Sequence, residues 1–86
     1  MGDAWNALAD PTRRKILQLL SKNDMSAGEI AENFNISKPS ISHHLTVLKN
    51  ADLIYGEKHG QSITYAINTT VFQDLLRVFS DFTKRE

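Results

Sequence analysis

Residues 36–50 constrain the fold of this chain more than any other stretch, because their apolar residues keep the spacing of a helix with one buried side. Ser37 is a favourable N-cap residue, and Pro39 falls in the first turn, where its missing N–H does no harm. The apolar positions recur at i, i+4 and i+7 as Ile41, Leu45 and Leu48. This narrow stripe predicts a helix anchored to a core along one side and otherwise presented to solvent.

The side of this helix opposite the stripe carries small polar groups. At about 100° per residue, the residues that project away from the core are Pro39, His43, Thr46 and Asn50, flanked by Ser40 and Ser42. Hydroxyls and amides can read base edges in a DNA major groove, and the nearby Lys38 and Lys49 can meet phosphates. An ordinary amphipathic surface helix is the alternative interpretation of this stretch by itself.

The segment just before this helix favours the DNA-binding interpretation. Ser26 followed by Glu29 has the spacing of a capping box, which predicts a helix from Ser26 to Phe34. Residues 35–37 then form a three-residue link. Two short helices joined in this way predict a helix-turn-helix over residues 26–50, with a plain helical hairpin as the alternative.

Two further helices are predicted nearer the N-terminus. The first covers residues 3–8, with Trp5 and Leu8 one turn apart. Asp10 then caps a second helix, in which Pro11 occupies the first position and residues 12–21 follow. The apolar side of this helix consists of Ile16, Leu17, Leu19 and Leu20. Arg13 and Arg14, at the start of this helix, either contact phosphates or hold an internal ion pair.

Beyond Asp52 the pattern becomes that of two strands, over residues 53–58 and 62–67. The second strand alternates Ile63, Tyr65 and Ile67 with small or polar residues. His59 and Gly60 are expected to form the tight turn between them. A hairpin directly after a presented helix is a wing, here residues 53–67. Lys58 and Gln61 at its tip are candidates for contacts to phosphate or to the minor groove, and the alternative is a hairpin without a ligand.

The last predicted helix, residues 70–84, carries two neighbouring apolar stripes. Together they span about 160°, more than the ~100° that packing on a single core requires. We therefore predict a homodimer through residues 3–8 and 70–84, with a larger monomer core as the alternative. The predicted interface residues are Trp5, Leu8, Val71, Phe72, Leu75, Leu76, Val78, Phe79 and Phe82.

The whole chain of 86 residues is expected to form one domain, residues 1–86. The fold class is mainly α with a small β-hairpin, a winged helix-turn-helix of about five helices and a two-stranded wing. No apolar run approaches the ~18 residues of a membrane span, and residues 1–10 lack a signal-peptide pattern. We therefore expect a cytoplasmic protein without membrane insertion. The chain has no cysteine, which excludes disulfides, thiolate metal sites and a cysteine nucleophile.

Formal net charge at pH 7 is zero, whereas strong nucleic-acid binders usually carry a basic excess. Lys38, Lys49 and Lys58 nevertheless lie in the half of the chain assigned to DNA. This distribution predicts a modest positive surface and a moderate, salt-sensitive affinity.

These features, taken in order, resemble the ArsR family of winged-helix repressors. The motifs are Asp10-Pro11-Thr12-Arg13-Arg14, then Glu29-Ile30-Ala31, then residues 37–45 followed by Leu48, and the hairpin ending at Tyr65. They cover nearly the whole chain, and its short, cysteine-free form looks closest to the SdpR-type autorepressors. The resemblance implies a homodimer on a roughly palindromic operator, with recognition helices about 34–36 Å apart in successive major grooves.

The chain departs from the family's metal-sensing members. Their Cys-x-Cys pair falls where Ser26 and Gly28 stand here, and the last helix offers only Asp74 and Asp81 in place of metal-binding histidines. We expect neither a metal nor a cofactor. Gln61 replaces the second basic residue that family wings often carry.

The histidines receive separate predictions. His43 points outward and is a candidate for base or phosphate contact. His44 lies beside the apolar stripe, and we expect it to be partly buried and hydrogen-bonded. An enzyme is not expected, because Ser40 and Ser42 neighbour these histidines on one helix with no carboxylate to orient a base.

The predicted function is sequence-specific repression of transcription, with the chain's own gene as a target. A winged helix used for protein–protein contact is the alternative, and the neutral net charge is its best support. Because no cysteine or metal site is evident, release of the DNA is expected to depend on a sequestering protein partner or on the protein's own concentration.

Overall fold

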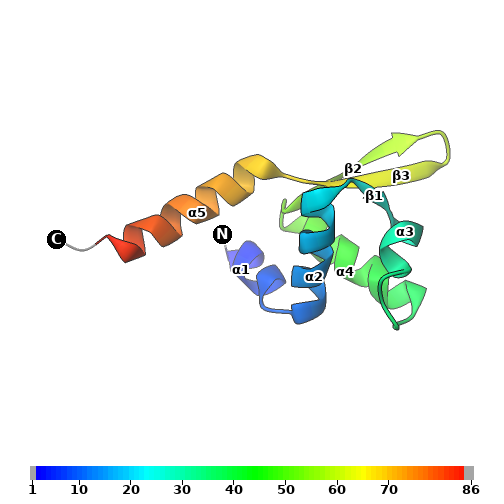
Figure 1. Cartoon of the computed structure of the whole chain (residues 1–86), viewed down its shortest axis with the longest axis horizontal. Coiled ribbons are helices and arrows are strands. Elements are labelled where there is room, and N and C mark those ends of the chain that lie inside the picture. The colour runs from blue at the N-terminus through cyan, green and yellow to red at the C-terminus, as the bar shows by residue number, and fades with distance from the viewer. Residues whose placement is uncertain (1, 85–86) are drawn as a thin grey trace.

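The computed structural model describes residues 2–84, which form five helices and one three-stranded sheet (Figure 1). The elements run α1 (Gly2–Leu8), α2 (Pro11–Lys22), β1 (Met25–Ser26), α3 (Ala27–Ala31), α4 (Lys38–Asn50), β2 (Ile54–His59), β3 (Ser62–Ile67) and α5 (Thr69–Thr83). Helices α2, α3 and α4 gather on one side of the sheet, while the β2–β3 hairpin and α5 project at opposite ends (Figure 1). The predicted winged helix-turn-helix is confirmed.

One apolar core joins most of these elements. Its largest fully buried side chains are Ile16, Ile30, Ile41, Leu48, Leu53 and Ile54. Each helix from α1 to α5 contributes at least one buried residue, and α5 contributes Leu75. The core therefore fixes α4 against α2 and α3 from behind.

No helix among residues 2–84 is long and apolar enough to cross a membrane.

The helix starts follow the capping signals in the sequence. Asp10 Oδ2 accepts a hydrogen bond from the Arg13 N–H at 3.0 Å. Ser26 and Glu29 form the predicted capping box, with bonds of 3.2 and 2.9 Å. Ser37 Oγ accepts from the Ser40 N–H at 3.2 Å, which begins α4. Each cap satisfies a backbone donor that the helix itself leaves free.

The predicted third helix is too long, because α3 ends at Ala31 and not at Phe34. After Ala31 the backbone makes tighter i→i+3 bonds, from Asn33 N to Ile30 O and from Phe34 N to Ala31 O. Lys15 stabilises this turn from α2. Its Nζ donates to Asn33 O at 3.3 Å and lies 5.0 Å from the centre of the Phe34 ring.

The two-stranded wing of the prediction is also corrected, since β1 pairs with β3 to give the order β1-β3-β2. Strand β2 begins and ends one residue later than predicted, so Gly60 and Gln61 form the turn between His59 and Ser62. Gly60 supplies a φ of +63° there. Helix α5 spans Thr69–Thr83, one residue earlier than predicted at each end.

A tight helix end directs the chain from α4 into the wing. Asp52 has a φ of +61°, its N–H donates to Lys49 O, and the next N–H, of Leu53, donates to Leu48 O. This pair of bonds is the Schellman arrangement at a helix C-terminus. It places Leu53 in the core and starts β2 immediately afterwards.

Candidate DNA-binding surface

Helix α4 is buried along one stripe and exposed on the opposite side. Ile41, Leu45 and Leu48 are buried, as their spacing predicts. The predicted contact residues of this helix are all exposed, namely Lys38, Pro39, Ser40, Ser42, His43, Thr46 and Lys49. The helix is therefore held from behind by apolar packing and presents a polar surface that is free in the single chain.

Two hydroxyls on this surface have a defined role in hydrogen bonding. Ser37 Oγ donates to Ser40 Oγ at 2.9 Å, which leaves the Ser40 proton free to be donated outward. Thr46 Oγ1 donates to Ser42 O at 3.0 Å, which leaves its lone pairs free to accept. One turn of α4 thus offers a donor, which suits a phosphate oxygen or a base acceptor, and the next offers an acceptor, which suits a donor on a base edge.

His43 and His44 point in different directions. Their ring centres are 5.9 Å apart with the planes inclined by 55°. His43 is exposed, whereas His44 is half-buried with its Nδ1 3.3 Å from Nη1 of Arg13. The prediction of a partly buried, hydrogen-bonded His44 is confirmed. No group of three or more histidine and carboxylate side chains within residues 2–84 is placed to hold a metal ion.

Within the described residues, Arg13 and Arg14 bind backbone carbonyls near the end of α1 and do not form the internal ion pair of one predicted alternative, while the phosphate contact of the other alternative stays a prediction. The Arg13 partners are Ala7 O at 2.8 Å and Asn6 O at 3.2 Å, and the Arg14 partners are Leu8 O at 2.8 Å and Ala9 O at 3.0 Å. Cations are favourable at a helix C-terminus because the last carbonyls there have no partner within the helix. Ion pairs among the described residues occur on α5 instead, at Arg77–Asp74 and Lys84–Asp81.

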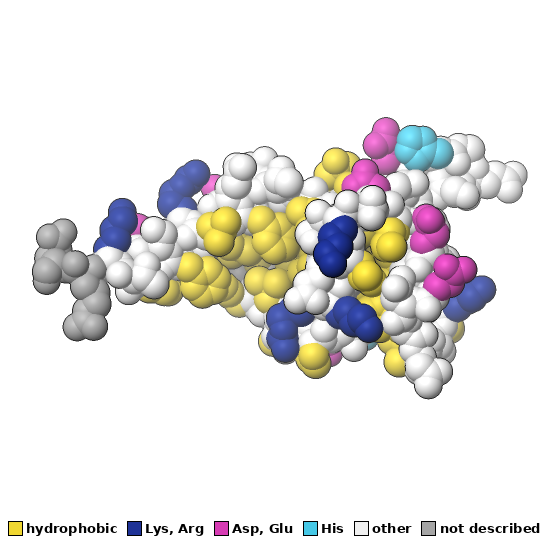
Figure 2. All heavy atoms as spheres, viewed as in Figure 1, with side chains coloured by type: hydrophobic (Ala, Val, Ile, Leu, Met, Phe, Trp, Pro, Cys, Tyr) yellow, Lys and Arg dark blue, Asp and Glu magenta, His cyan; other side chains and the backbone are white. Residues whose placement is uncertain are grey.

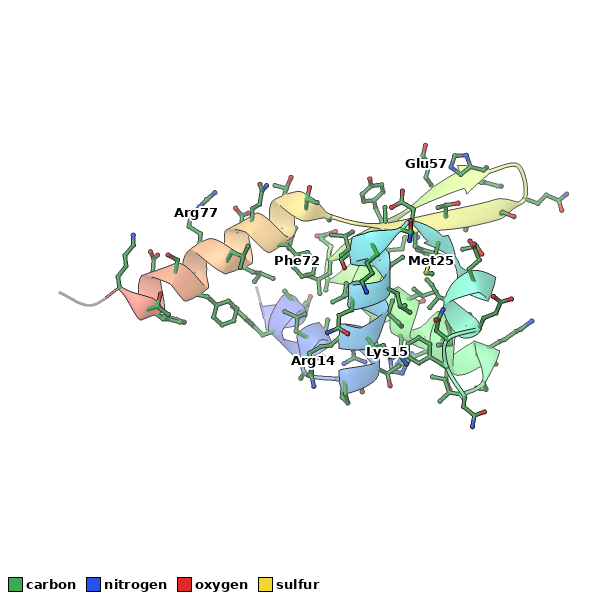
Figure 3. The ribbon with its side chains drawn as sticks, viewed as in Figure 1. Arg14, Lys15, Met25, Glu57, Phe72 and Arg77 are labelled. Carbon is green, nitrogen blue, oxygen red and sulfur yellow. The ribbon has the colours of Figure 1, made fainter. Side chains whose placement is uncertain are left out.

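The wing presents Lys58 and His59 on opposite sides. Lys58 pairs with Ile63, and strand alternation puts it on the same side as the buried Ile54. Glu57 and His59 share the other side, and Glu57 points away from the helices (Figure 3). Lys58 therefore lies on the side of the hairpin that faces the helices. Gln61 is exposed in the turn.

The predicted dimer surface divides into exposed and internal residues. Leu76, Phe79 and Phe82 are 67%, 49% and 76% exposed, and Trp5 is 36% exposed. Hydrophobic side chains run along α5 in Figure 2. The half-buried residues are Leu8, Val71, Phe72 and Val78, and the first three pack against the core. Leu75 is only 3% exposed in the single chain, because it packs in the core. Its assignment to the dimer interface is therefore corrected.

Comparison with known proteins agrees with this architecture. Residues 10–55 match the model of the bacterial regulatory protein family arsR. The transcriptional repressor SdpR of Bacillus subtilis (strain 168) is 54% identical over 85 residues, which cover 99% of this chain and 94% of that protein. The crystal structure of an ArsR family transcriptional regulator superposes with a TM-score of 0.77 at 31% identity, covering 99% of this chain and 92% of the other. An ArsR-like regulator from Rhodococcus sp. RHA1 gives a TM-score of 0.87 at 28% identity, covering 94% and 74%. This chain therefore belongs to the arsR family of bacterial regulatory proteins.

Proposed function

We propose that this chain represses transcription by binding a specific double-stranded DNA site as a homodimer. The observation that carries the proposal is the exposed polar surface of α4, which lies directly opposite its buried stripe of Ile41, Leu45 and Leu48. A helix held in this way can enter a major groove and bring Ser40, Ser42 and His43 to base edges. Lys38, Lys49 and Lys58 would then meet phosphates.

The exposed apolar residues of α5 support the dimer. Leu76 and Phe82 are among the most exposed large hydrophobic side chains of the molecule. Solvent-exposed apolar surface of this kind is unfavourable in a monomer and is removed when a second copy covers it. A dimer with two-fold symmetry requires a roughly palindromic site whose half-sites lie about 34–36 Å apart.

We further propose that one operator lies upstream of the gene that encodes this chain. The support is the similarity over almost the whole length of both proteins to SdpR, which is named a transcriptional repressor. Such a protein acts in the cytoplasm, where bacterial DNA is found, and needs no catalytic activity. Release from DNA would follow from sequestration by a protein partner or from dilution of the dimer.

The test is binding of the full chain to DNA from upstream of its own gene, with random DNA as the control and salt varied. We expect specific retardation that weakens steeply with salt, because each phosphate contact releases counterions. A footprint would then give the half-site spacing. Equal binding to both DNAs would contradict autorepression, and no binding to either would favour the protein-contact function that the neutral net charge also fits.

A further inference from the structure

The guanidinium of Arg13 connects two helices that the proposed function uses in different ways. Its Nε and Nη2 donate to carbonyls at the end of α1, as described above. Its Nη1 lies 3.3 Å from Nδ1 of His44, on α4. Helix α1 carries Trp5 of the proposed dimer surface, and α4 carries the proposed DNA surface. One side chain therefore bonds to both.

Arg14 provides an internal comparison. It is the next residue on α2, it carries the same group, and it also binds carbonyls near the end of α1. Within residues 2–84, its side chain donates to the carbonyls of Leu8 and Ala9, and none of its hydrogen bonds there reaches α4. The two arginines thus share the stabilisation of α1 but differ in the connection to His44.

The connection to His44 is directional, whereas the remaining support of α4 at this point is apolar. Leu45 beside it is buried in the core, and apolar packing tolerates small shifts better than a hydrogen bond between two planar groups does. His43, the neighbour of His44 on the other side, is exposed on the proposed DNA surface. A small rotation of α4 about its axis would therefore move the DNA-facing side chains.

We propose that Arg13 is a positioning residue that transmits the placement of α1 to α4 through His44, and so sets the half-site spacing that the dimer prefers. This inference rests on the proposed function. It predicts that the two recognition helices of a dimer are held at one separation by a polar link from the dimer surface, in addition to the core.

The link also specifies which ring nitrogen of His44 takes part. Arg13 can only donate, so in this bond Nδ1 of His44 is the acceptor.

The first test measures spacing preference with the full chain. The probe is a duplex of two half-sites selected by the wild-type protein from random DNA, with the spacer changed one base pair at a time. We expect the wild type to lose on the order of tenfold in affinity at the wrong spacing, as coupling of 1–3 kcal/mol gives. Arg13→Gln and His44→Ala should flatten this preference to less than about threefold. Arg14→Gln, the matched control, should keep it.

His44→Asn provides a conservative rescue, because the side-chain oxygen of asparagine can accept close to the position of Nδ1. This variant should keep the spacing preference that His44→Ala loses. A purely structural role for Arg13 would give no difference between these two variants. Circular dichroism and sedimentation confirm beforehand that each variant is folded and dimeric. An unchanged preference in folded, dimeric Arg13→Gln would overturn the proposal.

A second measurement does not depend on DNA, so the two proposals can fail separately. In the free protein at pH 8, the ¹⁵N shifts of the His44 ring should identify Nδ1 as the unprotonated nitrogen. Amide exchange in α4 should be faster in Arg13→Gln than in Arg14→Gln. Wild-type protein that selects no DNA would refute the proposed function. Equal amide exchange in α4 of the two variants would separately refute the link between Arg13 and His44.

Discussion

Trp5 and Phe79 meet edge to face, with their ring centres 5.1 Å apart and their planes at 89°. The contact joins α1 to α5, the two elements nearest the ends of the chain. Edge-to-face pairs of this kind contribute about 0.5–1.5 kcal/mol beyond the area that they bury. Both rings keep exposed surface, so the contact organises an apolar face without closing it.

The first prediction concerns this face. Replacing Leu76 and Phe82 together by serine should convert a dimer into a monomer, because it removes the most exposed apolar groups of α5. Sedimentation equilibrium measures the change, and near-native thermal stability would show that the fold is intact. Arg77→Ser is the matched control, since Arg77 points away from the body of the molecule (Figure 3). A double variant that remains dimeric would place the interface elsewhere.

The second prediction concerns the DNA surface of α4. His43→Ala and Ser42→Ala should each weaken specific binding by about 1–3 kcal/mol if these residues read bases. Lys38→Ala should weaken specific and random binding alike and reduce the salt slope by about one. His59→Ala serves as the control, because it lies on the outer side of the wing with Glu57. Unchanged operator affinity in His43→Ala would show that another surface meets the DNA.

The third prediction separates stability from recognition on the same helix. Leu45 is buried, so Leu45→Ala should lower the free energy of unfolding by about 2–5 kcal/mol. Ser42→Ala, three residues before it and exposed, should change stability by less than about 0.5 kcal/mol. Urea denaturation measures both. Equal effects of the two changes would contradict the orientation of α4.

The fourth prediction concerns Gly56. A Cβ at this position would lie 2.9 Å from Cγ2 of Ile63 and 3.4 Å from Cε1 of Tyr65. Gly56→Ala should therefore destabilise the domain by about 1–3 kcal/mol, since the side chain of Ile63 on the neighbouring strand must move. Gly28→Ala is the control, for which we expect stability to change in the opposite direction. Its nearest neighbour would be Ser26 Oγ at 3.9 Å, and alanine in a helix should stabilise by about 0.5–1 kcal/mol. Thermal unfolding of both variants tests the pair.

The fifth prediction concerns the pH dependence of stability. The backbone N–H of Arg13, and then the charge of its guanidinium, lower the pKa of Asp10 despite some opposing desolvation. A pKa that is lower in the folded state gives stability that is present above the unfolded pKa and lost as pH falls through the folded one.

Asp10→Ala should therefore cost about 1 kcal/mol near pH 7, the usual worth of an N-cap. The difference from wild type should shrink below about pH 4. Denaturant unfolding from pH 7 to pH 3 measures it, with Asp24→Ala as an exposed control. A difference that stays constant down to pH 3 would show that the ionised carboxylate is not what stabilises α2.

The helix starts and the recognition stripe could be predicted because their causes are local. The caps at Asp10, Ser26 and Ser37 each act within three residues, and the stripe of α4 follows from helix periodicity. Strand β1 could not be predicted, since two residues carry no periodic signal and Met25 becomes a strand residue only by pairing with Tyr65. The early end of α3 depends on Lys15 of α2, which is distant in sequence.

The order of helices, the hairpin and the polar side of α4 follow from local patterns in the chain, because short-range capping and the alternation of apolar residues specify them. The use of the surplus apolar residues of α5 depends instead on long-range packing. Leu75 enters the core while Leu76 stays exposed, since α5 meets the body along one line only. Long-range packing also selects the partners of Arg13, whose hydrogen bonds join α1 and α4 across a distance in sequence that no local pattern encodes.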